Sequence, residues 1–430
     1  MIIGIDVSRA NRRQKSGTEW YSYHLIKNLA QIDPENQYIL YTDSPLRGGL
    51  LDLTRSDMDE DNHQEGEVKF DKKGFQIIKS PHNNFKVKIL NWPFYFLWTQ
   101  GRLSLEMLFR KPDVLFVPAH TIPLIHPKKT VNTIHDVAFE RSQNLFREES
   151  LGSESRPFRF FINFLVRLFT FNKYRAHSLD YLRWSTRFAL KHARKIITVS
   201  QSSKEEILDA YGCEKCQKDK IAVVYNGYDN RNYKKIEDPV GEKEVLDKYG
   251  LEKPYILYVG RLERKKNTPL FVEAYAEAKC ANKDFDPNLV LIGNAGYGYD
   301  EVMYTIMEYD LESQVFIPGW AEEKDMPYIF NAATAFVFPS KKEGFGIPLL
   351  QALGCGVPVA ASCIPPFREV VQDAALFFNP VDRTEMSKAL ERIVLDKDLR
   401  RDLVEKGRKR AQEFSWRKCA QETLEIIENL

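Results

Sequence analysis

The sequence predicts an α/β protein with two Rossmann-like parallel-sheet domains that face each other across a cleft. The chain has 430 residues, which is too long for one ordinary hydrophobic core and suits two domains of about 200 residues each. Short β-branched runs alternate with helical patterns in both halves, as is typical of βαβ units on a parallel sheet. A charged, turn-rich stretch near residues 230–250 separates the two halves.

Each half supplies its own set of expected strands. In the first half a helix is expected at 21–32, and the strands are expected at 2–7, 37–42, 75–80, 113–118, 131–136 and 195–200. In the second half helices separate the strands, which are expected at 255–260, 288–293, 315–319, 335–340 and 357–362. The domains are therefore predicted at residues 1–235 and 236–412.

Composition excludes several classes of protein. The 62 basic and 60 acidic residues give a net charge of +2, so no overall field favours a nucleic-acid partner. The chain starts directly with a strand pattern rather than a signal peptide, and no apolar run reaches the roughly 18 residues that span a bilayer. We therefore expect a cytoplasmic protein. Cys213 and Cys216 form a lone CxxC pair with no second pair at metal-ligand spacing, which favours a surface turn over a zinc site.

Two segments interrupt the βα alternation. The acidic stretch around Asp57 and Asp59 resembles a metal-binding DxD, but no adjoining strand or glycine turn presents it, so a solvated loop is the better interpretation and no metal site is assigned. Residues 156–175 interleave aromatic residues with arginines. They fit either a helix packed on its own domain or a helix that makes a peripheral contact with the anionic inner face of the cell membrane.

Polar residues follow the predicted strands, where ligands bind in open parallel sheets. His135 and Asp136 follow one strand, Arg261 and then Lys266 follow another, and Glu343 follows a third. An arginine can direct two donors onto a diphosphate, and a lysine can add a point charge. Each residue alone also fits a structural role, as a buried pair or a solvated face. Their joint placement after strands favours a site.

Glycines accompany these side chains. Gly17 precedes the helix at 21–32 and leaves room for a phosphate to approach backbone N–H groups, so we assign it to diphosphate binding. In "EGFGIPLL" the glycines let the backbone bend close to a ligand, and the following helix offers free N–H groups to an anion. No P-loop motif occurs, and "GFG" lacks the third glycine of a dinucleotide fingerprint.

At this point the chain resembles the retaining glycosyltransferases of the GT-B fold in glycosyltransferase family 4, close to bacterial mannosyltransferases and glucosyltransferases of polysaccharide assembly. The resemblance covers nearly the whole chain apart from the segments near 55–75 and 145–175. Its carriers include "GTEWYSYHLIKNLA", "TIHDVAF", "RFALKHARKIITVSQSSKEEIL", "YVGRLERKKN", "VFIPGW" and "FVFPSKKEGFGIPLLQALGCGVPVAAS". It implies an acceptor-binding first domain, a donor-binding second domain, and a last helix, at 413–430, that crosses back to the first domain.

The resemblance also implies roles for individual residues. His135 would lie against the transferred sugar, near its 6-hydroxyl and the reacting face, with Asp136 beside it as a further catalytic candidate. Glu343 would accept hydrogen bonds from the 3- and 4-hydroxyls of that sugar, and Arg261 and Lys266 would hold the donor diphosphate. The remaining donor contacts, to the sugar, the base and the ribose, would come from Gly344, Phe345, Gly346, Ile317, Gly319 and Gln351.

Gln351 departs from the family pattern, which has a glutamate there. An amide still accepts a hydrogen bond from a ribose hydroxyl but loses the assistance of charge, which roughly halves such a bond. We expect weaker donor binding, by about 1 kcal/mol, rather than a loss of catalysis. The alternative is a non-catalytic nucleotide-sugar-binding or regulatory protein, and Gln351 is the feature that favours it.

The implied reaction moves a hexose from a nucleotide-diphosphate sugar to a glycan or lipid-linked acceptor with retention of anomeric configuration and no obligatory metal or other cofactor. No side chain stands out as a nucleophile, so a front-face path is the better hypothesis. GDP-mannose is the first expected donor and UDP-glucose the second, both from the resemblance. An epimerase could use the same two domains, whereas a phosphorylase would need a Schiff-base lysine that nothing in the sequence marks.

Overall fold

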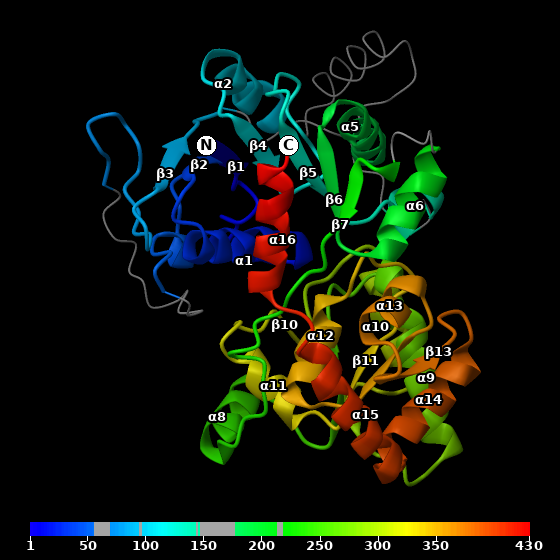
Figure 1. Ribbon diagram of the computed structural model, residues 1–430. Helices are drawn as coiled ribbons and strands as arrows, with labels where there is room; N and C mark the ends of the chain where they lie inside the picture. Colours follow the sequence, from blue (N-terminus) through cyan, green and yellow to red (C-terminus); the bar gives the residue numbers. More distant parts are fainter. Residues whose placement is uncertain (56–68, 94–96, 143–144, 147–176, 213–217) are drawn as a thin grey trace. The chain divides into compact units, whose positions relative to one another are not determined.

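The computed structural model describes the chain except for residues 56–68, 94–96, 143–144, 147–176 and 213–217. The chain divides into two compact units (Figure 1). Unit 1 comprises Met1–Arg141, Arg147–Tyr225 and Trp416–Leu430. Unit 2 comprises Ser142–Phe146 and Asn226–Ser415.

Unit 1 is built on a sheet of seven parallel strands in the order β3-β2-β1-β4-β5-β6-β7. The strands are β1 (Ile2–Asp6), β2 (Gln37–Thr42), β3 (Phe85–Ile89), β4 (Val114–Val117), β5 (Thr130–Ile134), β6 (Lys195–Thr198) and β7 (Ile221–Val223). The chain first adds strands on one side of β1 and then on the other, so the topological switch point lies between β1 and β4. The described helical elements are α1 (Gly17–Ile32), η1 (Gly48–Leu50), η2 (Thr99–Leu103), α2 (Ser104–Phe109), α3 (Ala138–Arg141), α5 (Ser178–His192), α6 (Gln201–Tyr211) and α16 (Trp416–Glu428).

The C-terminal helix α16 packs on α1 within unit 1 (Figure 1). The ring of Trp416, the first residue of α16, stacks on His24 of α1 with 5.1 Å between ring centroids. Trp20 stacks on His24 as well, at 5.3 Å. This aromatic stack joins the last helix of the chain to the first.

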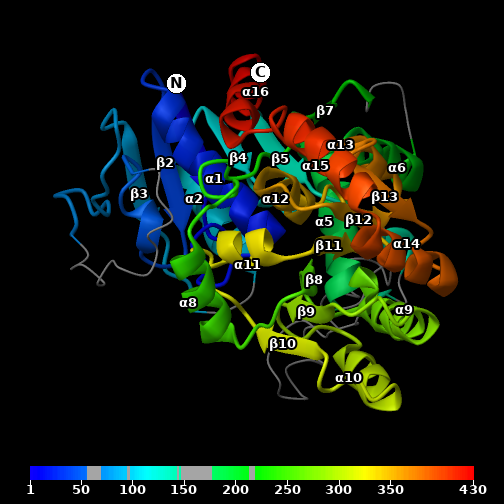
Figure 2. The same cartoon turned by 90° about the horizontal axis from the view of Figure 1, so that it is seen from below.

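Unit 2 is built on six parallel strands in the order β10-β9-β8-β11-β12-β13, with its switch point between β8 and β11. The strands are β8 (Tyr255–Val259), β9 (Asn288–Ile292), β10 (Val315–Gly319), β11 (Ala335–Phe338), β12 (Val359–Ser362) and β13 (Ala375–Phe378). Figure 2 shows α9 and α10 on one side of this sheet and α11 and α12 on the other, as right-handed crossovers in opposite directions require. The helical elements are α8 (Pro239–Tyr249), η4 (Arg264–Lys266), α9 (Thr268–Ala281), α10 (Tyr299–Glu308), α11 (Met326–Ala332), α12 (Ile347–Cys355), α13 (Pro365–Val371), α14 (Arg383–Leu395) and α15 (Lys397–Ala411).

The fold class agrees with the sequence prediction, but one strand was wrongly placed and two were missed. Residues 75–80 make only isolated bridges, and the strand beside β2 is β3, whose alternating Phe85, Val87 and Ile89 fit the pleat better. The exposed side chain of Ile77 shows that the earlier apolar run does not serve the core. The two strands without a prediction, β7 and β13, are only three and four residues long.

The boundaries between the units also differ from the predicted ones. Residues 226–235 belong to unit 2, because the Tyr233 ring packs on Phe330 and its hydroxyl donates to Glu323. Residues 413–415 belong to unit 2 as well, where Phe414 packs on Phe345. These aromatic anchors lie in stretches whose charge and turn content suggested linkers.

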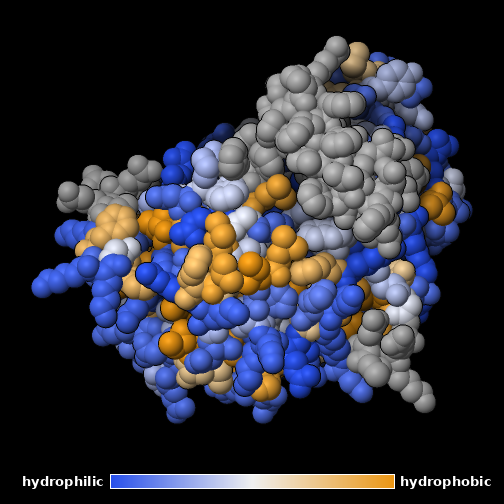
Figure 3. Space-filling view, turned by 90° about the horizontal axis from the view of Figure 1, so that it is seen from above, coloured by the Kyte–Doolittle hydropathy of each residue, from blue (hydrophilic) through white to orange (hydrophobic). Residues whose placement is uncertain are grey.

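One surface of unit 1 carries exposed hydrophobic side chains. Leu105, Leu108 and Phe109 of α2 are exposed, Phe109 by 78%. Leu124 is also exposed and lies beside α2, since its N–H donates to Ser104 Oγ at 2.9 Å. Figure 3 shows the face seen from above, on which hydrophobic residues form a band. No helix in the described part of the chain is long and apolar enough to cross a membrane.

Candidate functional site

The candidate donor site lies at the carboxyl edge of the unit 2 sheet, around its topological switch point. The strand ends β10, β9, β8 and β11 are neighbours there. Gly260 and Arg261 follow β8, and Glu343 follows β11. Ligands bind at such switch points because the two connections diverge and leave the strand ends open. The sequence prediction had placed these residues after strands but had no means of knowing that β8 and β11 are adjacent.

Glycines let three strand ends approach closely. Gly293 has φ of +142°, and a Cβ on it would lie 2.1 Å from the carbonyl oxygen of Gly260. Its N–H donates to the carbonyl of Gly319 at 2.7 Å, and the Gly260 N–H donates to Ile292 at 2.9 Å. The predicted residue Gly319 therefore belongs to the same edge as Gly260. Gly293 was not predicted as a site residue, although its place at the end of a strand was a usable signal.

The centre of the site is an ion pair between Lys266 and Glu343. Lys266 Nζ contacts Glu343 Oε1, and the Ser340 hydroxyl donates to the same oxygen at 3.0 Å. The two charged side chains are 19% and 11% exposed. Lys266 also lies over the Phe338 ring, 5.5 Å from its centroid. One carboxylate oxygen is thus fully engaged, whereas Oε2 of Glu343 makes no hydrogen bond to any described residue and can accept one from a ligand.

Arg261 is held more loosely than Lys266. Its side chain is 60% exposed, and it forms an ion pair with Glu263 that spans 3.8 Å. Its backbone is fixed, because the buried Tyr258 hydroxyl donates to the Arg261 carbonyl at 2.8 Å. A mobile guanidinium on a fixed base can turn toward a diphosphate.

The glycine turn leads into α12. Gly346 has φ of +100°, and a Cβ there would come within 2.9 Å of Leu349, so the turn requires glycine. The Phe345 ring is buried against Phe414, so only the backbone of Phe345 can face a ligand. Gly344 is likewise buried.

Gln351 lies on α12 and is half-buried. Its amide makes no hydrogen bond to the residues that the structure describes, so both of its polar atoms are available. Ile317 is half-buried on β10, at the edge of the sheet. The structure leaves both residues accessible, as nucleotide contacts need to be.

In unit 1, His135 follows β5 at the carboxyl edge of the sheet. Its ring meets the Tyr21 ring edge to face at 4.8 Å, and Nε2 lies 3.4 Å from the carbonyl of Pro118. The Tyr21 hydroxyl lies 3.1 Å from Thr133 Oγ1, two residues before His135. Burial, followed by the nearby His120, lowers the pKa of His135 to about 4. The imidazole is therefore neutral near pH 7. Tyr21 was not predicted as a site residue.

Asp136 and Gly17 have local roles in unit 1. Asp136 Oδ1 accepts from the Ala138 N–H at 3.1 Å, in a turn just before α3, and the Asp136 carbonyl contacts His120 Nε2 at 2.7 Å. Gly17 is exposed and opens α1, with no atom within 4 Å of a Cβ placed on it. The helix start already holds a carboxylate, since Glu19 accepts from the Ser16 N–H at 3.2 Å.

Three interpretations of the sequence fall outside the described residues. These are the CxxC pair Cys213 and Cys216, the DxD pair Asp57 and Asp59, and the aromatic segment 156–175. Among the residues that the structure does describe, no cluster of three or more histidine, cysteine, aspartate or glutamate side chains could hold a metal ion.

Comparison with known proteins agrees with this architecture. Residues 16–231 match the model of Glycosyltransferase Family 4, and residues 242–410 match that of Glycosyl transferases group 1. The O-antigen chain mannosyltransferase B of Escherichia coli is 30% identical over 333 residues, which cover 75% of this chain and 82% of the relative. The O-antigen chain mannosyltransferase RfbU of Salmonella typhimurium is 24% identical and covers 75% and 78%.

Solved structures share the fold at low identity. Anabaena Alr3699/HepE in complex with UDP and glucose superposes with a TM-score of 0.65 at 18% identity, covering 100% of this chain and 99% of that one. WaaG, a glycosyltransferase involved in lipopolysaccharide biosynthesis, superposes with a TM-score of 0.67 at 14% identity, covering 99% of each chain. The fold and the matches define a glycosyltransferase of the GT-B fold. Within that class, the chain belongs to glycosyltransferase family 4.

Proposed function

We propose that this enzyme transfers a hexose from a nucleotide-diphosphate sugar to a glycan or lipid-linked acceptor with retention of anomeric configuration. Mannose is the preferred candidate for the hexose, and glucose is the second candidate. The observation that carries the proposal is the grouping of Lys266, Ser340 and Glu343 at the switch point of unit 2. It combines a cation for a phosphate with a carboxylate oxygen for sugar hydroxyls. A nucleotide-diphosphate sugar carries phosphates and sugar hydroxyls, so it contacts the cation and the carboxylate at the same time.

In this proposal unit 2 supplies most of the contacts to the donor. Lys266 and Arg261 contact the diphosphate, and Gly17 offers it backbone N–H groups at the start of α1. Glu343 Oε2 accepts from the 3- and 4-hydroxyls of the hexose. Gln351 accepts from the ribose. The backbone of 344–346 supports the sugar, and Ile317 and Gly319 contact the base.

The reaction follows a front-face path. The bond between the anomeric carbon and the diphosphate oxygen breaks, the acceptor oxygen attacks from the same face, and its proton passes to the departing phosphate. Lys266 and Arg261 stabilise the negative charge that develops on that phosphate, so the path needs no metal. Neutral His135 hydrogen-bonds to the 6-hydroxyl of the sugar and shields the reacting face from water, with Asp136 fixing the segment that follows it.

The choice of mannose comes from relatives that are named mannosyltransferases, among them the two described above. Glucose comes second because a structural neighbour was solved with UDP-glucose. A thermal-shift screen against nucleotide sugars, with and without a chelator, identifies the donor, because a bound ligand stabilises the fold by mass action. We expect the largest shift with GDP-mannose. Retention is then read from the anomeric coupling of the product by NMR, and an inverted product contradicts the mechanism.

Gln351 favours a second candidate, a nucleotide-sugar binder without turnover. Donor hydrolysis in the absence of acceptor separates the two. Slow release of nucleoside diphosphate supports the transferase, whereas tight binding with no release supports the binder.

A lipid-linked acceptor is supported by the exposed face of α2. Arg110 and Lys111 directly follow the exposed Leu108 and Phe109, and both cations are themselves exposed. Apolar side chains flanked by cations suit an anionic lipid surface. Co-sedimentation with phosphatidylglycerol vesicles should fall when Leu108 and Phe109 are both changed to serine. Unchanged sedimentation would exclude this face as the contact.

A further inference from the structure

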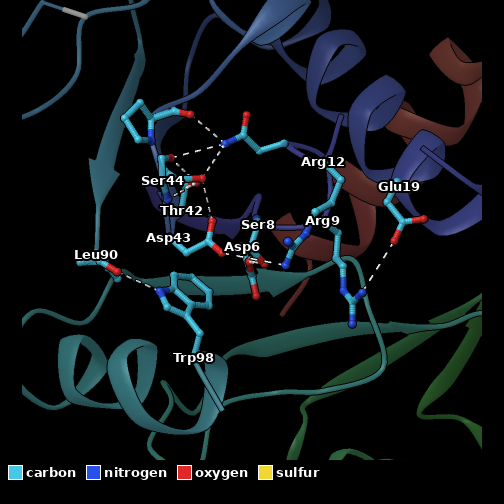
Figure 4. Close-up of polar contacts among 12 residues, drawn as sticks. Asp6, Ser8, Arg9, Arg12, Glu19, Thr42, Asp43, Ser44, Leu90 and Trp98 are labelled. Atoms are coloured by element: carbon cyan, nitrogen blue, oxygen red, sulfur yellow. Dashed lines mark hydrogen bonds and ion pairs between the residues drawn. The ribbon is translucent and has the colours of Figure 1, made fainter. Parts of the chain in front are cut away.

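The carboxyl edge of unit 1 carries a second polar group, at the ends of β1 and β2. Asp6 is the last residue of β1, and Asp43 follows β2. Arg9 and Arg12 come from the segment that leads from β1 to α1 (Figure 4). The group borders the switch point between β1 and β4, where an open parallel sheet binds its ligands. None of these four residues has a role in the donor site.

Asp6 is a buried carboxylate with one unused oxygen. The residue is 5% exposed. Its Oδ1 accepts from the Ser8 N–H at 3.0 Å and from the Ser8 hydroxyl at 2.7 Å. Its Oδ2 makes no hydrogen bond within the described part of the chain. Burial raises the pKa of Asp6, whereas Ser8 and the charge of Arg9 lower it. Because Oδ2 is not fully enclosed by the protein, it stays open to water and can accept a hydrogen bond from a ligand.

The backbone around Asp6 is fixed in place. Asn11 Nδ2 donates to the carbonyl of Pro45 at 2.9 Å, and Asn11 Oδ1 accepts from the Arg47 N–H at 3.1 Å. The buried Thr42 hydroxyl donates to the carbonyl of Ser44 at 2.7 Å. The two Asn11 bonds join the segment after β1 to the segment after β2, and the Thr42 bond fixes the turn that follows β2, so the group is preorganised.

The arginines keep their donors available but are not an anion site. Arg9 lies 3.7 Å from Glu19, and Arg12 lies 4.0 Å from Asp43, and neither guanidinium makes a closer hydrogen bond to a described residue. Both side chains are more than half exposed. Each positive charge is offset by a carboxylate, so the group as a whole does not favour phosphate. The Asp6 carboxylate accepts hydrogen bonds and the two guanidinium groups donate them. This combination suits the hydroxyls of a neutral sugar, which both donate and accept.

We propose that Asp6, Arg9 and Arg12 bind the neutral terminal sugar residue of the acceptor glycan, with Asp6 Oδ2 accepting from one of its hydroxyls. This inference rests on the proposed function, because it names the acceptor of that reaction. It predicts that the enzyme recognises the sugar end of its acceptor and not a phosphate.

Saturation-transfer NMR on the full chain tests the site without turnover. The probes are the methyl α-glycosides of mannose, glucose, galactose and N-acetylglucosamine. We expect at least one to bind, and Asp6→Asn to weaken its binding by about tenfold, the size of one hydrogen bond to a charged group. Arg9→Gln, at a position that is more than half exposed, should weaken binding by about threefold.

Asp52→Asn is the matched control. Asp52 Oδ1 also accepts from the N–H and the hydroxyl of a residue two positions on, Thr54, and it also lies in unit 1. Binding should not change in this variant. An equal loss in Asp6→Asn and Asp52→Asn would mean that the turn only stabilises the fold, and thermal melting of both variants gives the same information independently.

The inference is also overturned if no glycoside binds, if Arg9→Gln has no effect, or if inorganic phosphate shows ³¹P broadening that depends on Arg9 and Arg12. Failure of the proposed function is seen separately, in the nucleotide-sugar thermal shift, which reports on unit 2. If glycosides bind through Asp6 while no donor binds, unit 1 binds glycans but the transferase proposal is wrong.

Discussion

The two carboxyl edges differ in the way their polar groups are paired. In unit 2, Lys266 and Ser340 converge on a single oxygen of Glu343, so one cation and one carboxylate are held in direct contact. In unit 1, His135 is neutral and packed against an aromatic ring, and the arginines stand at 3.7 and 4.0 Å from their carboxylates. In the proposed function, this difference corresponds to a unit 2 that binds most of the charged donor and a unit 1 that binds the neutral acceptor.

The largest expected effect is that of Glu343→Ala. The change removes the proposed acceptor of the sugar hydroxyls and the ion-pair partner of Lys266. Two charge-assisted hydrogen bonds at about 1.5–3 kcal/mol each correspond to a loss of at least about a hundredfold in kcat. Steady-state kinetics with saturating donor measures it. Glu405→Ala, on the exposed face of α15, is the control. A loss in kcat below about threefold would show that the pair has no part in turnover.

Lys266→Met should mainly raise the donor KM, by about tenfold or more, because it removes the largely buried cation that is proposed to contact the diphosphate. Lys283→Met, an exposed site in unit 2 just before β9, is the matched control. A double-mutant cycle with Glu343→Gln sharpens the comparison, because side chains in contact couple. Additive effects would mean that the ion pair does not persist when donor is bound.

The sequence predicts the site residues at these sheet edges only where the residues lie together in a short motif. Arg261, Lys266 and Glu343 follow strands within short motifs, so the residues could be named from the sequence. Ser340 is three residues before Glu343, yet nothing in the sequence shows that its hydroxyl turns toward that carboxylate. The adjacency of β8 and β11 is a property of the sheet order, which strand patterns alone do not give.

Unit 1 was harder to predict for the same reason. Asp6 looks like the polar end of a buried strand, and its significance appears only when Arg9 and Asp43 are seen around it. Tyr21 lies in an ordinary helical pattern, and only the packing of α1 brings its ring to His135. The βα alternation predicted the class of fold, whereas the false strand at 75–80 followed from an apolar run that contributes exposed residues.

The next effect is a pH dependence of the stability of unit 1. All eight histidines of the chain lie in the segments of this unit. Burial, and then the charges of Lys27 and Lys15, lower the pKa of His24 to about 3, and that of His135 is lowered to about 4. The two histidines bind protons at a higher pH in the unfolded chain than in the folded one. The stability that the folded chain gains from keeping them neutral is therefore complete above about pH 6.5 and falls as the pH approaches 4. Each pKa unit is worth about 1.4 kcal/mol.

We therefore expect thermal melting of unit 1 to shift down between pH 7 and pH 4.5 more than that of unit 2. His24→Phe retains an aromatic ring between Trp20 and Trp416 but cannot be protonated, so it should flatten the profile. His82→Phe, at an exposed histidine of unit 1, is the control. If His24→Phe leaves the pH dependence intact, other groups cause it.

The smallest effect is expected at Gln351, and it tests how far unit 2 depends on charge. Its amide makes no hydrogen bond among the described residues, so Gln351→Ala disturbs no internal contact. One neutral hydrogen bond to the ribose is lost, which should raise the donor KM by about tenfold or less and leave kcat within about twofold. Gln351→Glu restores a carboxylate and should lower the donor KM below that of the natural enzyme, because a charged acceptor makes a stronger bond. Equal losses of kcat in Gln351→Ala and Glu343→Ala would contradict this division, since the ribose contact would then act on the reacting carbon as strongly as the sugar contact does.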